Sequence, residues 1–99
     1  MMADEYRETA AARLHRMEEL FDALAERYRS APEKLHCCAE TKEMVRTLAE
    51  YLAGGLWLAD YEADERGELP KELKRGVLSQ DALYNLLCDV EREMMGGKE

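Results

Sequence analysis

The fold is decided at residues 28–35, which have the sequence YRSAPEKL. Pro32 disfavours a helical conformation for the residue before it, whereas proline itself suits the first position of a new helix. Apolar side chains recur at steps of three and four on both sides of this break, which is typical of amphipathic helices. Two helices joined by so short a connection run antiparallel, so the sequence predicts a long helical hairpin.

The first helix of the hairpin is expected over residues 4–29, with Asp4 as its N-cap. Its apolar stripe consists of Ala10, Leu14, Met17, Phe21, Leu24 and Tyr28. The opposite face is rich in charge and includes Arg13 and Glu18. We expect that face to be solvated, because charged side chains are rarely buried unless they are paired.

The second helix is expected over about residues 32–53. Its apolar stripe consists of Leu35, Cys38, Thr41, Val45, Leu48 and Leu52. Gly54 and Gly55 end this helix, because glycine readily adopts the left-handed conformation that follows a helix. At a rise of ~1.5 Å per residue, each arm of the hairpin is predicted to be about 35 Å long.

The remaining chain predicts shorter elements. A third helix is expected over residues 56–66, and one helical turn over residues 70–75. Val77 and Leu78 are expected to fill a gap in the core, and Ser79 to cap a last helix. The apolar face of that helix consists of Leu83, Leu86, Leu87, Val90 and Met94.

These elements predict an all-α fold, a three- to four-helix bundle in a single domain over residues 1–99. The hairpin occupies residues 1–55, and a C-terminal helical unit over residues 56–99 covers it. The hairpin needs this cover, because two helices alone bury too little apolar surface to offset the entropy of ordering the chain.

Charge and composition exclude several classes of protein. The 99 residues carry 14 Lys and Arg against 22 Asp and Glu, a formal net charge of −8. This charge disfavours binding to nucleic acid or to anionic membranes, which depends on Lys and Arg. The longest apolar stretch, Leu56–Ala59, cannot span a membrane, and residues 1–30 contain no signal-peptide core. With an odd number of cysteines, two of them adjacent, the sequence predicts a cytoplasmic protein without a disulfide framework.

The segment from residue 60 to residue 75 is the candidate site. Asp60 and Asp64 are four residues apart, so on a helix they share a face and repel each other. The cations Lys74 and Arg75 follow in a net-positive segment, residues 68–78. One interpretation is structural: Arg75 or Lys74 folds back onto Asp60 or Asp64 and locks the turn.

The other interpretation is functional. The turn, together with Trp57, Tyr61 and Tyr84, forms a recognition surface in which Lys74 and Arg75 anchor an acidic or carboxylate-bearing group. Arginine and aromatic residues concentrate binding energy at protein interfaces. We therefore take Trp57, Asp60, Tyr61, Asp64, Lys74, Arg75 and Tyr84 as candidate binding residues.

Metal and catalytic motifs find little support. The run Asp60-x-Glu62-x-Asp64 lacks the glycine that a calcium loop needs at its sixth position, where Glu65 stands. The run of residues 36–38, HCC, has no second ligand pair at zinc-site spacing. The sequence shows no recognisable pairing of a nucleophile with a base, and no phosphate-binding loop. We predict no catalytic residues, no metal ligands and no cofactor, and an enzymatic activity is disfavoured.

The segment over residues 57–87 contains WLADYEADE (57–65), GELP (67–70) and LKRGVLSQDALYNLL (73–87). With these motifs, about a third of the chain resembles a small bacterial family classed as a domain of unknown function. The resemblance implies an all-helical cytoplasmic protein. It implies no activity, so no catalytic residues are transferred to this chain.

Three functions remain open from the sequence. The first is a non-enzymatic protein–protein interaction module with an unidentified protein partner. The second is a small-ligand-binding protein or enzyme that uses Asp60 and Asp64. The third is a coiled-coil-like assembly element, because the long apolar stripes of residues 1–53 could pair with a second copy in a homodimer.

Overall fold

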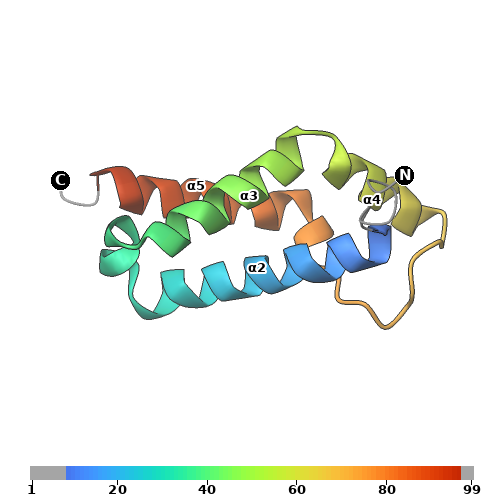
Figure 1. Ribbon diagram of the computed structural model, residues 1–99, viewed down its shortest axis with the longest axis horizontal. Helices are drawn as coiled ribbons and strands as arrows, with labels where there is room; N and C mark the ends of the chain where they lie inside the picture. The colour runs from blue at the N-terminus through green and yellow to red at the C-terminus, as the bar shows by residue number, and fades with distance from the viewer. Residues whose placement is uncertain (1–8, 97–99) are drawn as a thin grey trace, which may run out of the picture.

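The computed structural model describes residues 9–96, in which all regular structure is helical (Figure 1). The elements in chain order are α2 (Ala10–Ser30), η1 (Pro32–Cys37), α3 (Ala39–Ala53), α4 (Leu56–Glu65), η2 (Gly76–Leu78) and α5 (Gln80–Gly96), where η1 and η2 are 3-10 helices. No strand occurs within residues 9–96, and the all-α prediction is confirmed.

The described chain forms an elongated bundle with extents of 46 × 30 × 21 Å. In Figure 1, α2 and α3 run in opposite directions and η1 joins them at one end of the bundle. The helix α5 returns along the bundle and packs against η1, α3 and α2. The short α4 lies at the end opposite η1. The predicted hairpin with a C-terminal helical cover is therefore present.

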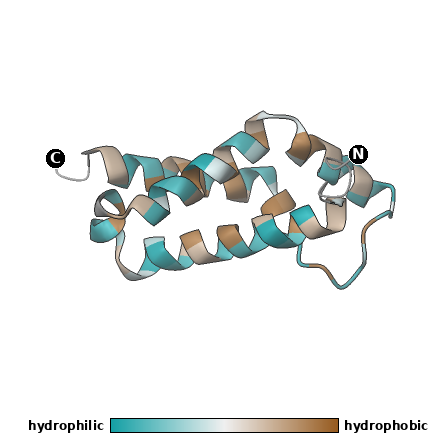
Figure 2. Ribbon diagram, in the orientation of Figure 1, coloured by the Kyte–Doolittle hydropathy of each residue, from teal (hydrophilic) through white to brown (hydrophobic). Residues whose placement is uncertain are grey.

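Helix α2 follows the predicted stripe. The side chain of Thr9 caps its start by accepting a hydrogen bond from the Ala12 amide at 3.0 Å. The proposed cap Asp4 lies outside the described residues. Leu14, Met17 and Leu24 are buried on one face, and Figure 2 shows hydrophobic positions alternating with hydrophilic ones along the helix.

The predicted second helix is wrong in its first turns. Residues 32–37 form the 3-10 helix η1, Cys38 is extended at φ −105° and ψ 114°, and α3 begins only at Ala39. With 15 residues, α3 is about 22 Å long rather than 35 Å. The break has a tertiary cause: η1 packs against α5, α2 and α3, and Leu35 is buried there.

The predicted helical turn over residues 70–75 is also wrong, because this segment forms turns without a helix. Other expectations for the C-terminal half are confirmed. Val77 and Leu78 are buried, and Ser79 Oγ accepts a hydrogen bond from the Ala82 amide at 3.3 Å.

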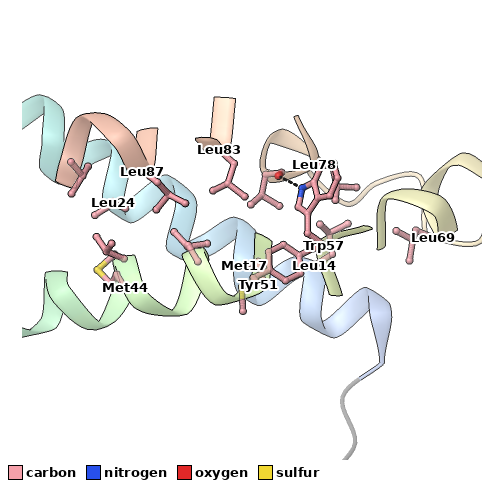
Figure 3. Packing of buried hydrophobic residues seen from close by; sticks show 14 of the residues in the cluster. Leu14, Met17, Leu24, Met44, Tyr51, Trp57, Leu69, Leu78, Leu83 and Leu87 are labelled. Carbon is pink, nitrogen blue, oxygen red and sulfur yellow. Dashed lines mark hydrogen bonds between the residues drawn. The ribbon is translucent and has the colours of Figure 1, made fainter. Parts of the chain in front are cut away.

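The core is continuous from α2 to α5 (Figure 3). Trp57 Nε1 donates a hydrogen bond to the Val77 carbonyl at 3.0 Å, drawn as a dashed line in Figure 3. The amide of Val77 donates to Glu18 Oε1 at 2.8 Å. Both backbone groups of this buried residue are thus satisfied by side chains of α4 and α2, so η2 is held between these helices.

Candidate functional site

The turn before α4 sets the direction of that helix. Gly55 has a φ of +99°, in the left-handed region that favours glycine. A Cβ at Gly54 would lie 2.7 Å from the carbonyl oxygen of Glu50, so a larger residue there would force the backbone to shift. These two glycines let the chain leave α3 and start α4 within two residues.

The inner face of α4 carries Asp60, which is completely buried. Arg13 of α2 donates from Nε to Asp60 Oδ2 at 2.9 Å and from Nη2 to Oδ1 at 2.5 Å. Tyr51 of α3 donates its hydroxyl to Asp60 Oδ2 at 2.8 Å. Burial and the bond to Asp60 raise the pKa of Tyr51. This triad joins three helices through one carboxylate.

Sequence reasoning missed the partners in these buried contacts. Arg13 and Glu18 were expected on a solvated face, and that expectation is wrong: Glu18 is buried and only a small part of the Arg13 side chain is exposed. Arg13 is 47 residues from Asp60, and Glu18 is 59 residues from Val77. No local sequence pattern identifies such pairs. The signal that the sequence does contain is the position of these two charged residues close to the apolar stripe.

Asp64 and Arg75 do meet, as the structural interpretation of this turn predicts. Arg75 Nε donates to Asp64 Oδ1 at 2.5 Å. The same guanidinium donates to the carbonyls of Leu73, Pro70 and Lys71 at 2.7, 2.9 and 3.1 Å. Arg75 therefore holds the loop after α4 in shape and occupies carbonyls that a helix would have used.

Lys74 lies elsewhere, with its Nζ 3.2 Å from Asp22 Oδ2 of α2. This contact crosses a cleft of about 570 Å³ between α2 and the loop after α4. Acidic side chains dominate the cleft, which is lined by His15, Glu18, Glu19, Asp22, Glu72, Leu73 and Lys74. Lys74, Asp60 and the aromatic candidates are not brought together.

The outer face of α4 presents apolar and aromatic surface. The rings of Trp57 and Tyr61 stack at a centroid distance of 5.2 Å and an interplanar angle of 13°. Trp57 itself is buried, whereas Leu58 is 51% exposed and Tyr61 is 37% exposed. Leu58 and Tyr61 are three residues apart, so they share one helix face.

A cleft of about 480 Å³ lies beside this face. Its lining comes from α4 and from the segment where η2 passes into α5, and consists of Trp57, Leu58, Tyr61, Leu78, Ser79, Gln80 and Asp81. Tyr84 is one helical turn after Gln80, on the same face of α5, and is 57% exposed. Tyr84 itself does not line the cleft, so the structure brings together Trp57 and Tyr61 but not Tyr84. We call the lining of this cleft the α4–α5 surface.

The opposite end of the bundle holds a polar cluster around Cys38. Arg27 Nη1 lies 3.3 Å from Cys38 Sγ and 2.8 Å from Thr41 Oγ1, and Arg27 also pairs with Glu40 at 3.0 Å. Hydrogen bonds from the side chain and the backbone of Thr41, and from Arg27, lower the pKa of Cys38 to about 7. The Cys38 thiol thus lies in a polar cluster with Arg27 and Thr41 that favours its thiolate form.

No group of three or more His, Cys, Asp or Glu side chains within residues 9–96 is arranged to hold a metal ion. No helix in the same part of the chain has the length and hydropathy needed to cross a membrane.

Comparison with known protein families shows a similarity over most of the chain. Residues 14–96 match the family model described as a domain of unknown function (DUF4298). The match confirms the resemblance to a family of unknown function, and it extends the similarity to α2 and α3. No curated protein and no solved structure matches the chain.

Proposed function

Because the chain belongs to the DUF4298 family, a domain of unknown function, we propose a function from its own surface: a non-enzymatic protein–protein interaction module. The observation that carries this proposal is the exposed apolar face of α4 beside the cleft to α5. Leu58 and Tyr61 stand at 51% and 37% exposure over a buried, stacked tryptophan. Apolar and aromatic side chains grouped around a concave surface are typical of binding sites.

The proposed contact surface differs from the sequence-based one. It keeps Trp57 and Tyr61, adds Leu58, and leaves out Tyr84, which does not line the cleft. It leaves out Lys74 and Arg75 as anchors for an acidic group, because each of these cations is paired with a carboxylate of this chain. A partner would have to break those contacts before it could use either charge.

The alternative site at Asp60 and Asp64 has less support. Both oxygens of Asp60 accept hydrogen bonds inside the core, and Asp64 accepts one from Arg75. A ligand would have to displace these contacts to reach either carboxylate. The hypothesis of a coiled-coil-like homodimer also has less support. It was based on the apolar stripes, whose residues Leu14, Leu24 and Leu48 are fully buried within one chain.

Peptide display tests the proposed function. We expect a library of random 16-residue peptides, selected on the immobilised protein, to yield binders that lose affinity for the Leu58→Ala/Tyr61→Ala variant. Met95→Ala is the matched control, because Met95 is exposed on α5 and does not line the cleft. Circular dichroism verifies that each variant is folded. The proposal would be contradicted if no peptides are selected, or if the selected peptides bind the Leu58→Ala/Tyr61→Ala variant with unchanged affinity.

A further inference from the structure

The outer face of α4 changes character along its length. Leu58, Tyr61, Glu62 and Glu65 follow the spacing of one helix face, since they are separated by three, one and three residues. The first two are apolar or aromatic, and the last two are exposed acids. The Glu65 carboxylate, one helical turn after Tyr61, raises the pKa of the Tyr61 hydroxyl. The apolar and acidic halves are therefore continuous.

The acids on this face are exposed to solvent. Neither Glu62 nor Glu65 forms an ion pair with any residue in the described part of the chain. The nearest cations along the sequence form their ion pairs with other acids, because Arg66 pairs with Glu68 at 2.8 Å and Arg75 pairs with Asp64. The pKa of Arg66 is raised mainly by Glu68 and also by the charge of Glu62, so Glu62 attracts this cation without pairing with it. The C-terminal end of α4 adds the negative end of its helix dipole beside Glu65.

The opposite wall of the cleft also carries a negative charge. Asp81 lines it and likewise has no ion-pair partner within residues 9–96. Asp81 also lies in the first turn of α5, where the helix dipole favours an acid, so its presence has a structural reason. The attraction for a ligand cation is therefore assigned to Glu62 and Glu65.

We infer that the partner of the α4–α5 surface is a basic peptide segment of another protein, in which an apolar anchor side chain is followed by Lys or Arg. The inference rests on the proposed function and adds the chemistry of the partner. The anchor enters the cleft beside Leu58 and Tyr61, and the cation reaches Glu62 and Glu65. Along α4 the step from Leu58 to Glu65 is about 10 Å, or two turns of a helical ligand.

Charge complementarity selects this occupant over an acidic one. An acidic segment would bring carboxylates towards unpaired carboxylates, in a chain whose net charge is already −8. A wholly apolar segment would leave the acidic half of the face without a partner. A basic segment with one anchor satisfies both halves of α4 at once.

Three synthetic helical peptides of equal length test the inference. The first alternates Leu anchors with Lys at i+4 and i+7, the second replaces each Lys with Glu, and the third replaces each Leu with Ser. Fluorescence anisotropy measures binding of each peptide to the full chain at low and high salt. We expect only the Leu/Lys peptide to bind, and its affinity to fall as salt rises.

Charge-reversal variants separate local from overall charge. Glu62→Lys should weaken binding of the Leu/Lys peptide about fivefold, since it replaces an attraction at the surface by a repulsion. Glu33→Lys makes the same change in net charge at an exposed position in η1, at the other end of the bundle, and should leave affinity nearly unchanged. Equal weakening by both variants would overturn the inference, and so would equal binding of the Leu/Glu peptide.

The inference and the proposed function fail differently. Should the display-selected peptides depend on Leu58 and Tyr61 yet carry no excess of Lys and Arg, the basic partner is overturned and the interaction module stands. Should no peptide depend on Leu58 and Tyr61, both are overturned.

Discussion

Arg13 and Asp60 lie 47 residues apart in the chain, and the arginine binds both oxygens of the carboxylate. Removing Asp60 would leave a guanidinium and the Tyr51 hydroxyl without this buried partner. We expect Asp60→Ala to lower the free energy of unfolding by about 3 kcal/mol, as when one member of a buried ion pair is deleted. Urea denaturation measures the change.

Asp64 provides the matched control on the same helix. It also pairs with an arginine, but both side chains are partly exposed, at 27% and 30%. Asp64→Ala should therefore cost about 1 kcal/mol or less, because solvent screens an exposed pair. Similar losses for the two alanine variants would mean that the Asp60 contacts contribute no more than a surface ion pair.

Tyr51 makes the protein sensitive to high pH. Burial and the hydrogen bond to Asp60 raise the pKa of Tyr51 above its ordinary value of 10.0, so the folded state retains the proton more tightly than the unfolded state. The stabilisation that Tyr51 contributes is fully present below about pH 10. It is lost as pH rises further, because Tyr51 then ionises in the unfolded chain.

The Tyr51→Phe variant isolates this effect. At neutral pH it should be less stable by about 1 kcal/mol, through loss of one hydrogen bond. Between about pH 9 and pH 11 its free energy of unfolding should fall less steeply with pH than that of the parent protein, since the variant lacks the tyrosine whose pKa is raised. Guanidinium titrations at both pH values give the free energy of unfolding of each protein. An equal fall in free energy for the parent and the variant would contradict this role for Tyr51.

Cys38 should react as a thiolate near neutral pH. Its pKa is lowered from 9.0 to about 7, first by hydrogen bonds from Thr41 and also by Arg27. The rate of alkylation by iodoacetamide should therefore rise with a midpoint near pH 7, because the thiolate is the nucleophile.

The measurement uses a background in which Cys37 and Cys88 are replaced by Ser, so that Cys38 is the reacting thiol. In this background Thr41→Val should move the midpoint upwards, since it removes the hydroxyl donor. A thermal melt verifies that Thr41→Val is folded. A midpoint near 9.0 before the substitution would show that the cluster does not stabilise the thiolate.

The C-terminal helix should be indispensable for folding. Leu83, Leu87 and Val90 of α5 are buried against the rest of the core. Deleting residues 79–99 would expose the faces of α2 and α3 that α5 covers, and the remaining hairpin would not offset its entropy of ordering. We expect the truncated chain to lose most of its helical circular dichroism. Full helicity with a cooperative melt would contradict this.

Much of the fold could be predicted because it depends on local patterns. The apolar stripe around Leu14 and Leu24, the break at Pro32 and the cap at Ser79 involve residues within a few positions of one another. Backbone conformation and hydrophobic periodicity act at that range. The two errors, at residues 32–38 and 70–75, occur where tertiary contacts override local preference.

The candidate site was predicted less completely. Among its expected contacts, the one between Asp64 and Arg75 is present across 11 residues. Asp60 was expected to pair with a cation that follows it closely in the chain, but its partners come from α2 and α3. The exposed face of Leu58 was missed, because helical spacing alone does not tell which face of a short helix the rest of the protein covers.

By itself, the sequence determined that the chain is helical, where its main breaks lie, and that it is acidic, since these depend on residue type and near neighbours. Only the tertiary structure decided which charges are buried and which are displayed. Arg13 and Asp60 were removed from the surface by pairing across the bundle, while Glu62 and Glu65 were left outside. The physical reason is that burial of a charge depends on a partner distant in sequence, which only the packing of helices brings within reach.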